Sequence, residues 1–411
     1  MTARSARVGA VVVGILLVGL LLRGPIVAVA PVTATIRGEL DLSSAQLGLL
    51  TSLPVLCFAI MTPFASRLIG RAGANLATTI AIVGVGAGSI LRSAGGLEAT
   101  IVGTVLIGAF VTIGNVVVPV IIRRDIPRPR VGIVTGAYTS SLNVGSMITS
   151  IATAPLAEQF GWRGALVTWT AFSLLALAGW LLAIGPRAAA RWGTVRPTIE
   201  TGAIDTVAVD TSGIPVPRRS ARTWTSATAV LLSLAFAGQA FSYYGLTAWL
   251  PTILADEVGL SASAAGTGSS VFQVAAIAGA LGVPLIAARR GLTVAVCLVA
   301  VTWLSAPIGL LLAPEAWLLW GTLGGAAQGG GITVVFVLVV HLSRSGAHAR
   351  GLSAMVQGVG YALAATAPTL VGAARDATGG WVVPLLVVLG ALLVFTGCGF
   401  AGAYRTRSRA A

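Results

Sequence analysis

The chain alternates between long apolar runs and short polar segments. Each run is about 20 residues or longer, the length that a helix needs to cross the hydrocarbon core of a bilayer. Arginine clusters and Gly or Pro turns separate the runs. The twelve predicted spans are residues 8–36, 44–66, 75–94, 99–122, 132–157, 164–185, 224–254, 263–288, 292–312, 316–341, 351–374 and 382–403. The pattern therefore predicts an all-α membrane protein with twelve transmembrane helices.

One long polar segment interrupts this pattern, at residues 186–222. It holds six arginines, three acidic residues and four prolines, a composition typical of a linker. We therefore expect an N-terminal six-helix bundle over residues 1–185, a cytoplasmic linker over 186–222, and a C-terminal six-helix bundle over 223–411.

The two bundles are predicted to be repeats of each other. An offset of 218 residues carries Leu42 onto Leu260 and also relates three further pairs. These are Gly48 with Gly266, Arg71 with Arg289, and Gly73 with Gly291. At 219 residues, Gly161-Trp162 matches Gly380-Trp381. Parallel repeats of this kind indicate a pseudo-symmetric transporter whose substrate path lies between the repeats near the middle of the bilayer.

Composition and charge agree with a membrane protein and exclude nucleic acid as a partner. Apolar residues make up 56% of the chain and charged residues 9%, too few to cover a water-facing surface. The formal charge of +14 comes from arginines, nearly all of which lie between the spans. With both termini in the cytoplasm, 21 arginines fall on the cytoplasmic side, and Arg37, Arg92, Arg163 and Arg375 fall on the other. This asymmetry predicts a multi-pass protein of the bacterial inner membrane with cytoplasmic termini.

Several short motifs resemble one known family. They are Arg23-Gly24-Pro25, Leu42-Ser43 with Gly48-Leu49-Leu50-Thr51-Ser52-Leu53-Pro54, Gly114-Asn115-Val116-Val117-Val118-Pro119, Thr135-Gly136 with Tyr138-Thr139, and Gln239 with Tyr243-Tyr244 and Trp249-Leu250-Pro251. Together they resemble the cyanate/nitroimidazole permease branch of the major facilitator superfamily, and they cover nearly the whole chain outside the linker. The resemblance implies the major facilitator fold, alternating access and one central cavity, and it leaves the substrate open.

Arg23 is the leading candidate for a substrate contact. It lies about 15 residues from either end of the first predicted helix, too deep for its side chain to reach water easily. A midplane arginine costs about 2.5–3.5 kcal/mol on insertion scales, so it should face a cavity or a partner. No acidic residue lies inside a predicted span, so an anionic substrate could act as its counter-ion. The alternative is a structural arginine that binds carbonyls of a helix broken near Pro25.

Further polar residues inside the spans are candidate substrate contacts. The repeat places Gln239, Tyr243 and Tyr244 on the helix that corresponds to the helix of Arg23. The remaining candidates are Asn115, Tyr138, Asn143, Gln273, Gln328, Gln357 and Tyr361. Buried polar side chains also form hydrogen bonds between membrane helices, and this alternative stays open for each residue.

We therefore predict a secondary active or facilitative transporter for a small anionic or polar planar solute, similar to cyanate or nitroimidazole. A drug exporter for neutral or cationic compounds, or a membrane solute sensor that does not transport, are the alternatives. No catalytic group or metal-binding spacing is visible in the sequence, so we expect no enzyme activity, metal or cofactor. The expected partners are the small-molecule substrate and the lipid bilayer, with a coupling proton left open, and we expect a monomer.

Overall fold

A computed structural model gives the structure of the chain and describes residues 3–193, 226–343 and 346–410. All the regular elements in these ranges are helices. The first group comprises α1 (Ala3–Val27), η1 (Ala30–Val32), α2 (Thr33–Leu40), α3 (Ser44–Ala72), α4 (Ala74–Ser93), α5 (Leu97–Asp125), α6 (Arg128–Thr168), α7 (Thr170–Ile184) and α8 (Pro186–Ala190). The second comprises α10 (Ala227–Val258), α11 (Ala262–Arg290), α12 (Leu292–Leu312), η2 (Pro314–Ala316), α13 (Trp317–Leu342), α14 (Gly346–Ala364), α15 (Ala367–Thr378) and α16 (Val382–Ala410). We name α1–α8 the N-half and α10–α16 the C-half.

The described residues contain eleven helical stretches that are long and apolar enough to span a membrane. One of them, Arg128–Ile184, is 57 residues long and contains two passes. Gly161 separates these passes, because its backbone is non-helical at φ 68° inside α6. The structure thus agrees with the prediction of twelve transmembrane helices. Of the predicted linker, the first residues form α8, and residues 194–225 lie outside the described residues.

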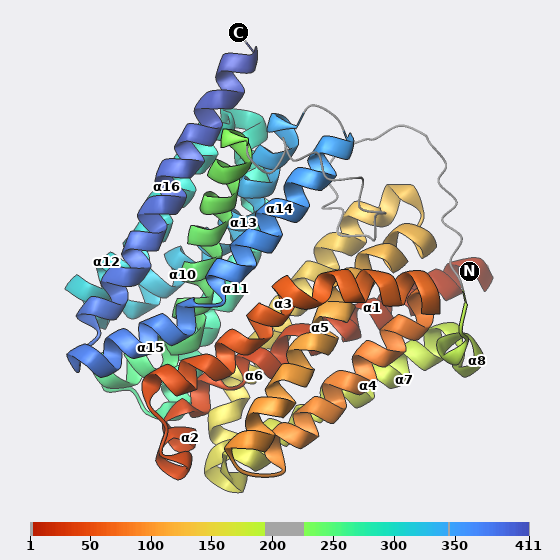
Figure 1. Cartoon of the computed structure of the whole chain (residues 1–411), viewed down its shortest axis with the longest axis horizontal. Coiled ribbons are helices and arrows are strands. Elements are labelled where there is room, and N and C mark those ends of the chain that lie inside the picture. The colour runs from red at the N-terminus through yellow and green to blue at the C-terminus, as the bar shows by residue number, and fades with distance from the viewer. Residues whose placement is uncertain (1–2, 194–225, 344–345, 411) are drawn as a thin grey trace.

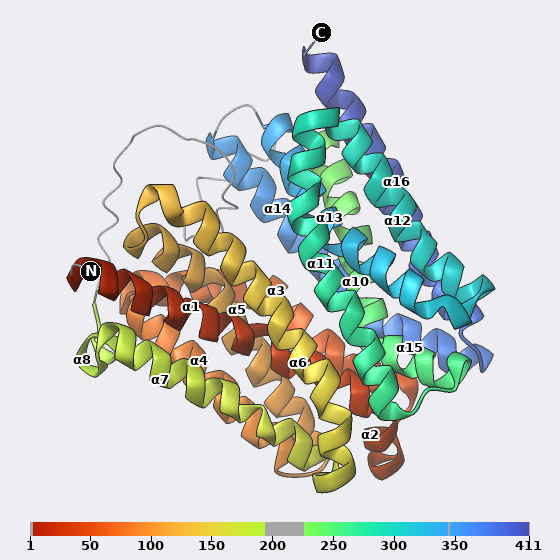
Figure 2. The same cartoon turned by 180° about the vertical axis from the view of Figure 1, so that it is seen from behind.

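The two halves form two groups of helices that meet at one end (Figure 1). In this view the groups meet near α2 and α15 and diverge toward the side where both ends of the chain lie. The view from behind shows α6 and α11 side by side along the line where the halves meet (Figure 2). We name the region of residues 33–48, 252–266 and 368–381 the closed end.

The backbone repeats the pattern that the sequence offset predicts. Six of the seven residues with positive φ among the described residues fall into three pairs that are 218 positions apart. The pairs are Asp41 with Gly259, Gly73 with Gly291, and Gly161 with Gly379. Asp41 and Gly259 both end a helix in the left-handed conformation, which glycine adopts freely and aspartate tolerates. The two repeats therefore share their helix ends as well as their sequence markers.

Two glycines allow close helix crossings between the halves at the closed end. A side-chain carbon at Gly48 of α3 would lie 2.5 Å from the carbonyl carbon of Pro368 on α15. A side-chain carbon at Gly266 of α11 would lie 2.6 Å from the carbonyl oxygen of Ser150 on α6. Gly48 and Gly266 are equivalent in the repeat, so the same glycine of each half lies at a close crossing.

Four hydrogen bonds join the halves at these crossings, among the residues that the structure describes. The hydroxyls of Thr33 and Thr252 lie 3.1 Å apart, and those of Ser52 and Thr369 lie 3.0 Å apart. The carboxylate of Asp376 accepts from the backbone N–H of Ser44 at 3.1 Å and of Ala45 at 2.9 Å. These N–H groups belong to the first turn of α3, where a helix lacks internal acceptors and favours an anion. An aspartate of the C-half thus caps a helix of the N-half.

Each half also carries a cluster of one acid, one tryptophan and one arginine at the closed end. In the N-half, Glu39 accepts from Trp162 Nε1 at 2.5 Å and is ion-paired with Arg163. In the C-half, Asp256 accepts from Trp381 Nε1 at 2.9 Å and from Arg375 Nη2 at 2.9 Å. Each cluster ties the segment around Gly161 or Gly379 to an earlier helix of the same half. The clusters hold each half together and do not cross between the halves.

Candidate functional site

Arg23 lies where the two halves meet, near the middle of the apolar stretch Val8–Leu40. Its Nη1 donates to the side-chain oxygen of Asn143 on α6 at 3.0 Å. Its guanidinium carbon lies 4.7 Å from the ring centroid of Tyr243 on α10. One side chain of α1 therefore contacts both halves.

Tyrosines surround this guanidinium. The chain has five tyrosines, and four of them, Tyr138, Tyr243, Tyr244 and Tyr361, lie near Arg23. The rings of Tyr243 and Tyr244 meet edge to face at 4.8 Å. Phenol groups supply both an apolar face and a hydroxyl, so this set can contact the faces and the polar edges of a planar solute.

Two asparagines on the N-half complete the group of predicted residues around Arg23. Asn143 accepts from Arg23 and donates to the carbonyl of Thr139 at 3.2 Å, which fixes the direction of its amide. Asn115 of α5 accepts from the hydroxyl of Tyr138 at 3.4 Å. Seven predicted residues therefore gather at one place, from α1, α5, α6, α10 and α14.

Three predicted glutamines form a separate group inside the C-half. Gln239 is fully buried, and its amide donates to the carbonyl of Gln328 at 2.9 Å. Gln273 is 2% exposed and donates to the hydroxyl of Thr247 at 3.5 Å. These contacts join α10, α11 and α13, while Gln239 Oε1, Gln273 Oε1 and Gln328 Nε2 have no partner among the described residues, so both alternatives stay open for these glutamines. Gln357 bonds within α14, to the hydroxyl of Ser353 at 3.0 Å.

Aromatic side chains that were not among the candidates lie next to the site. The ring of Tyr361 contacts Phe58 of α3 edge to face at 5.7 Å and Phe236 of α10 at 5.1 Å. Phe272 stacks parallel to Tyr243 at 6.3 Å. An apolar residue within an apolar span carries no sequence signal that separates it from lipid-facing neighbours, so only the fold identifies these rings.

Arg92 is a second buried arginine of the N-half. It lies in the last turn of α4, and its side chain is 1% exposed. Its Nη1 donates to the carbonyl of Pro25 at 2.7 Å. Its burial is in keeping with the sequence, since Arg92 falls within the predicted span 75–94.

Arg23 is the charged group of this site. In the part of the chain that the structure describes, carboxylates lie near helix ends, and none forms an ion pair with Arg23. The same described residues contain no group of three His, Cys, Asp or Glu side chains that could hold a metal ion. The three cysteines are free thiols. The chemistry of the site is therefore that of a cation with aromatic and amide neighbours.

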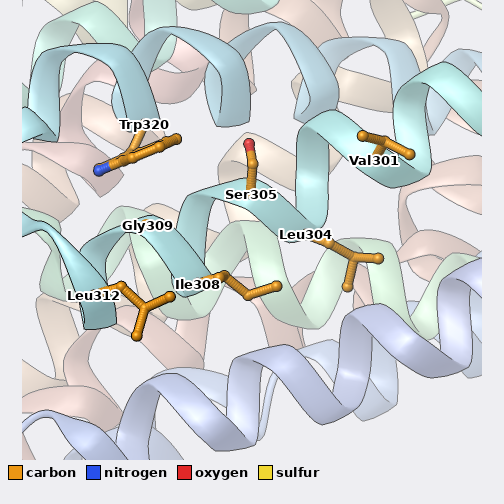
Figure 3. Close-up of a pocket in the computed structure, with 7 residues that line it drawn as sticks. All are labelled: Val301, Leu304, Ser305, Ile308, Gly309, Leu312 and Trp320. Carbon is orange, nitrogen blue, oxygen red and sulfur yellow. The ribbon is translucent and has the colours of Figure 1, made fainter.

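A hollow lies on the surface, away from Arg23. It is a groove of about 400 Å³ between α12 and α13, lined by Val301, Leu304, Ser305, Ile308, Gly309, Leu312 and Trp320 (Figure 3). Val301 is 61% exposed and Leu312 is 80% exposed. The Trp320 indole donates to the carbonyl of Ala313, so its polar edge is satisfied. A groove with this lining has no charge to orient a polar solute.

The fold and the site together define a multi-pass membrane transporter, with two six-helix halves around a central polar group. The chain belongs to the Major Facilitator Superfamily, which matches residues 12–365. Its relatives and its fold are those of transporters and not of enzymes.

Relatives with curated names support the predicted branch. The chain is 35% identical to the 2-nitroimidazole transporter of Escherichia coli (strain K12), over 92% of this chain and 91% of that protein. It is 32% identical to the uncharacterized transporter YycB of Bacillus subtilis (strain 168), over 96% and 94%. It is 25% identical to the cyanate transport protein CynX of Escherichia coli (strain K12), over 92% and 94%. The resemblance seen in the motifs is thus confirmed.

Solved structures share the fold at low sequence identity. A crystal structure of the nucleoside transporter NupG has a TM-score of 0.75 at 12% identity, over 95% of this chain and 99% of that one. A bacterial homolog of the lysosomal transporter Spinster, in an inward-facing and occupied conformation, has a TM-score of 0.70 at 18% identity, over 97% and 96%. These likenesses confirm the major facilitator fold.

Proposed function

We propose that this transporter moves a small anionic or polar planar solute by alternating access, with Arg23 as its charged contact. The observation that carries the proposal is a guanidinium that contacts both halves and has no carboxylate partner among the described residues. An anion bound there would supply the missing counter-charge. Cyanate and 2-nitroimidazole, named for two relatives, are both small and planar and serve as test solutes.

The site distinguishes this proposal from the alternatives. An exporter of cations gains from a carboxylate in the central cavity, and here the central charge is positive. The arrangement around Arg23 supports a transport site rather than a sensor, because it joins the two halves that must move relative to each other. We propose that Arg23, Asn143, Tyr138, Tyr243 and Tyr361 form the binding surface, with Tyr244 and Asn115 beside them.

The test is the affinity for each solute, measured by calorimetry on the purified full chain. Arg23→Gln keeps hydrogen-bonding capacity and removes the charge. Loss of one charge-assisted bond costs about 1.5–3 kcal/mol, or about 10- to 150-fold in affinity. Arg23→Lys keeps the charge without the planar fork and should recover part of the loss. Arg289→Gln, on an exposed residue of α11, is the control. Unchanged binding by a folded Arg23→Gln variant would refute the anion site.

We also propose that the protein lies in the inner membrane with both termini in the cytoplasm, so that the closed end faces outward. The distribution of loop arginines supports this orientation. Single cysteines near residues 205 and 408 should react with an impermeant maleimide only from the cytoplasmic side, and one near residue 257 only from the outside. Labelling of residues 205 and 257 from the same side would contradict the orientation.

A further inference from the structure

The buried Arg92 side chain has one hydrogen-bond acceptor among the described residues, the carbonyl of Pro25. Its other guanidinium nitrogens, Nε and Nη2, have no partner among these residues. A charge that is 1% exposed is costly in an apolar interior unless it is bonded. The bond to Pro25 therefore determines how this side chain lies between α4 and α1.

The Pro25 carbonyl belongs to a turn of α1 that lacks internal hydrogen bonds. Pro25 lies in the last turn of this helix, where carbonyls lack a donor within the helix and attract cations. Proline also has no N–H, so the carbonyl of Leu21 loses its usual partner. The turn that carries Arg23 is thus short of internal hydrogen bonds and needs support from outside the helix.

Arg92 is itself firmly placed. Its carbonyl accepts from the hydroxyl of Thr100 on α5 at 3.2 Å. A side-chain carbon at Gly103 of α5 would lie 2.6 Å from the Cα of Arg92, so the two helices are in backbone contact at this point. The packed pair of α4 and α5 therefore fixes the position of Arg92, and its guanidinium in turn binds the end of α1.

The repeat shows that these features occur together. At the 218-residue offset, Arg23, Pro25 and Arg92 correspond to Phe241, Tyr243 and Leu310. The C-half has neither the midplane arginine nor the proline nor the supporting arginine. The equivalent helix α10 has no arginine to position at this depth, and the C-half also has no arginine that would support it.

We propose that Arg92 is a positioning residue for transport: by binding the Pro25 carbonyl it fixes the turn of α1 that carries Arg23, and so places the Arg23 guanidinium between Asn143 and Tyr243. This inference rests on the proposed function, in which Arg23 contacts the solute. Arg92 acts through α1 and does not touch the solute.

A double-mutant cycle tests the coupling. The dissociation constants of cyanate and 2-nitroimidazole are measured for the full chain, for Arg92→Gln, for Arg23→Gln and for the double variant. Arg92→Gln should weaken binding about tenfold when Arg23 is present. It should have no further effect in the Arg23→Gln variant, because the group that it positions is gone. Equal weakening in both backgrounds, or a lower melting temperature with an unchanged dissociation constant, would assign Arg92 to stability alone.

Two further variants keep the test decisive if Arg92→Gln folds poorly. Arg92→Lys keeps a charged donor for the Pro25 carbonyl and should retain most of the affinity. Pro25→Ala restores an N–H to α1, so it should recover part of the affinity that Arg92→Gln loses. A folded Arg92→Lys that binds as weakly as Arg23→Gln, or no recovery by Pro25→Ala, would overturn the inference.

A ligand-free measurement separates this inference from the proposed function. If Arg23→Gln binds both solutes normally, the proposal of an anion site at Arg23 is refuted. The position of α1 must then be measured without a solute. A cysteine at residue 23 should then react with a small cationic thiosulfonate at a rate that Arg92→Gln changes at least about threefold. A cysteine at Gln357 on α14 should react at an unchanged rate. Equal rates at residue 23 with and without Arg92 would overturn the positioning role.

Discussion

The close crossing at Gly48 makes one prediction about the conformational equilibrium. In Gly48→Ala the new carbon would lie 2.5 Å from the Pro368 carbonyl carbon and 2.8 Å from the Thr369 Cα. Both neighbours are backbone atoms, which cannot rotate away as a side chain would. The substitution therefore forces α3 and α15 apart at the closed end.

The free-energy cost of this clash applies only to the conformation in which the closed end is shut. Overpacking of this kind costs about 1–3 kcal/mol, and it applies only while α3 and α15 touch. The higher helix propensity of alanine, about 1 kcal/mol, favours both conformations equally and cancels. The ratio of open to closed protein should therefore rise about 5- to 150-fold.

Spin labels can measure this ratio as a distance distribution. Labels at Thr35 on α2 and Glu257 on α10 lie on exposed positions of the two halves at the closed end. Gly48→Ala should add a longer distance to the distribution. The matched control is Gly329→Ala, where the new carbon would lie 2.8 Å from the carbonyl carbon of Ala276. Both of these residues lie in the C-half, so the control should lower the melting temperature and leave the distances unchanged.

Two results would refute this reasoning. One is a folded Gly48→Ala variant with the distance distribution of the parent protein. The other is an equal shift in Gly329→Ala, which would show that any loss of packing changes the equilibrium. Either result would mean that the crossing of α3 with α15 does not control the opening of the closed end.

Two other predictions follow from single contacts. Asp376→Asn removes the charge that caps α3 across the halves, so the open population should rise about two- to fivefold in the same distance measurement. The control is Asp256→Asn, whose bonds stay within the C-half and which should leave the open population unchanged. Tyr243→Phe keeps the ring face under Arg23 and should preserve solute affinity within about twofold, whereas Tyr243→Leu should weaken it about 2- to 30-fold in a calorimetric titration. Equal affinities for the phenylalanine and leucine variants would mean that the ring does not hold the guanidinium.

Hydropathy and the repeat offset predicted the helices because both depend on local composition. Each of the twelve spans appears within several residues of its expected bounds, and the capping box of Ser43 with Gln46 opens α3 as a short-range signal should. Arg23 was predictable for a related reason. A charge deep in an apolar helix is costly enough to require a special environment.

The faces of the helices could not be predicted in the same way. Gln239 and Tyr243 are one turn apart on α10, yet the glutamine binds α13 inside its own half and the tyrosine contacts Arg23. In a helix that is apolar all round, no periodicity shows which side faces a neighbour. The bond between Asp376 and Ser44 joins residues 332 positions apart, and only the packed halves bring them together.

The closed end is held by few polar contacts between the halves. Each of the four cross-half hydrogen bonds among the described residues contributes about 0.5–1.5 kcal/mol net, since water can replace it when the halves separate. The acid, tryptophan and arginine clusters stay within their halves and need not break. These polar contacts therefore add only a few kcal/mol to the free-energy difference between the two conformations. A solute that prefers the other conformation by that amount offsets them, so tight binding, which would slow solute release, is not required for this.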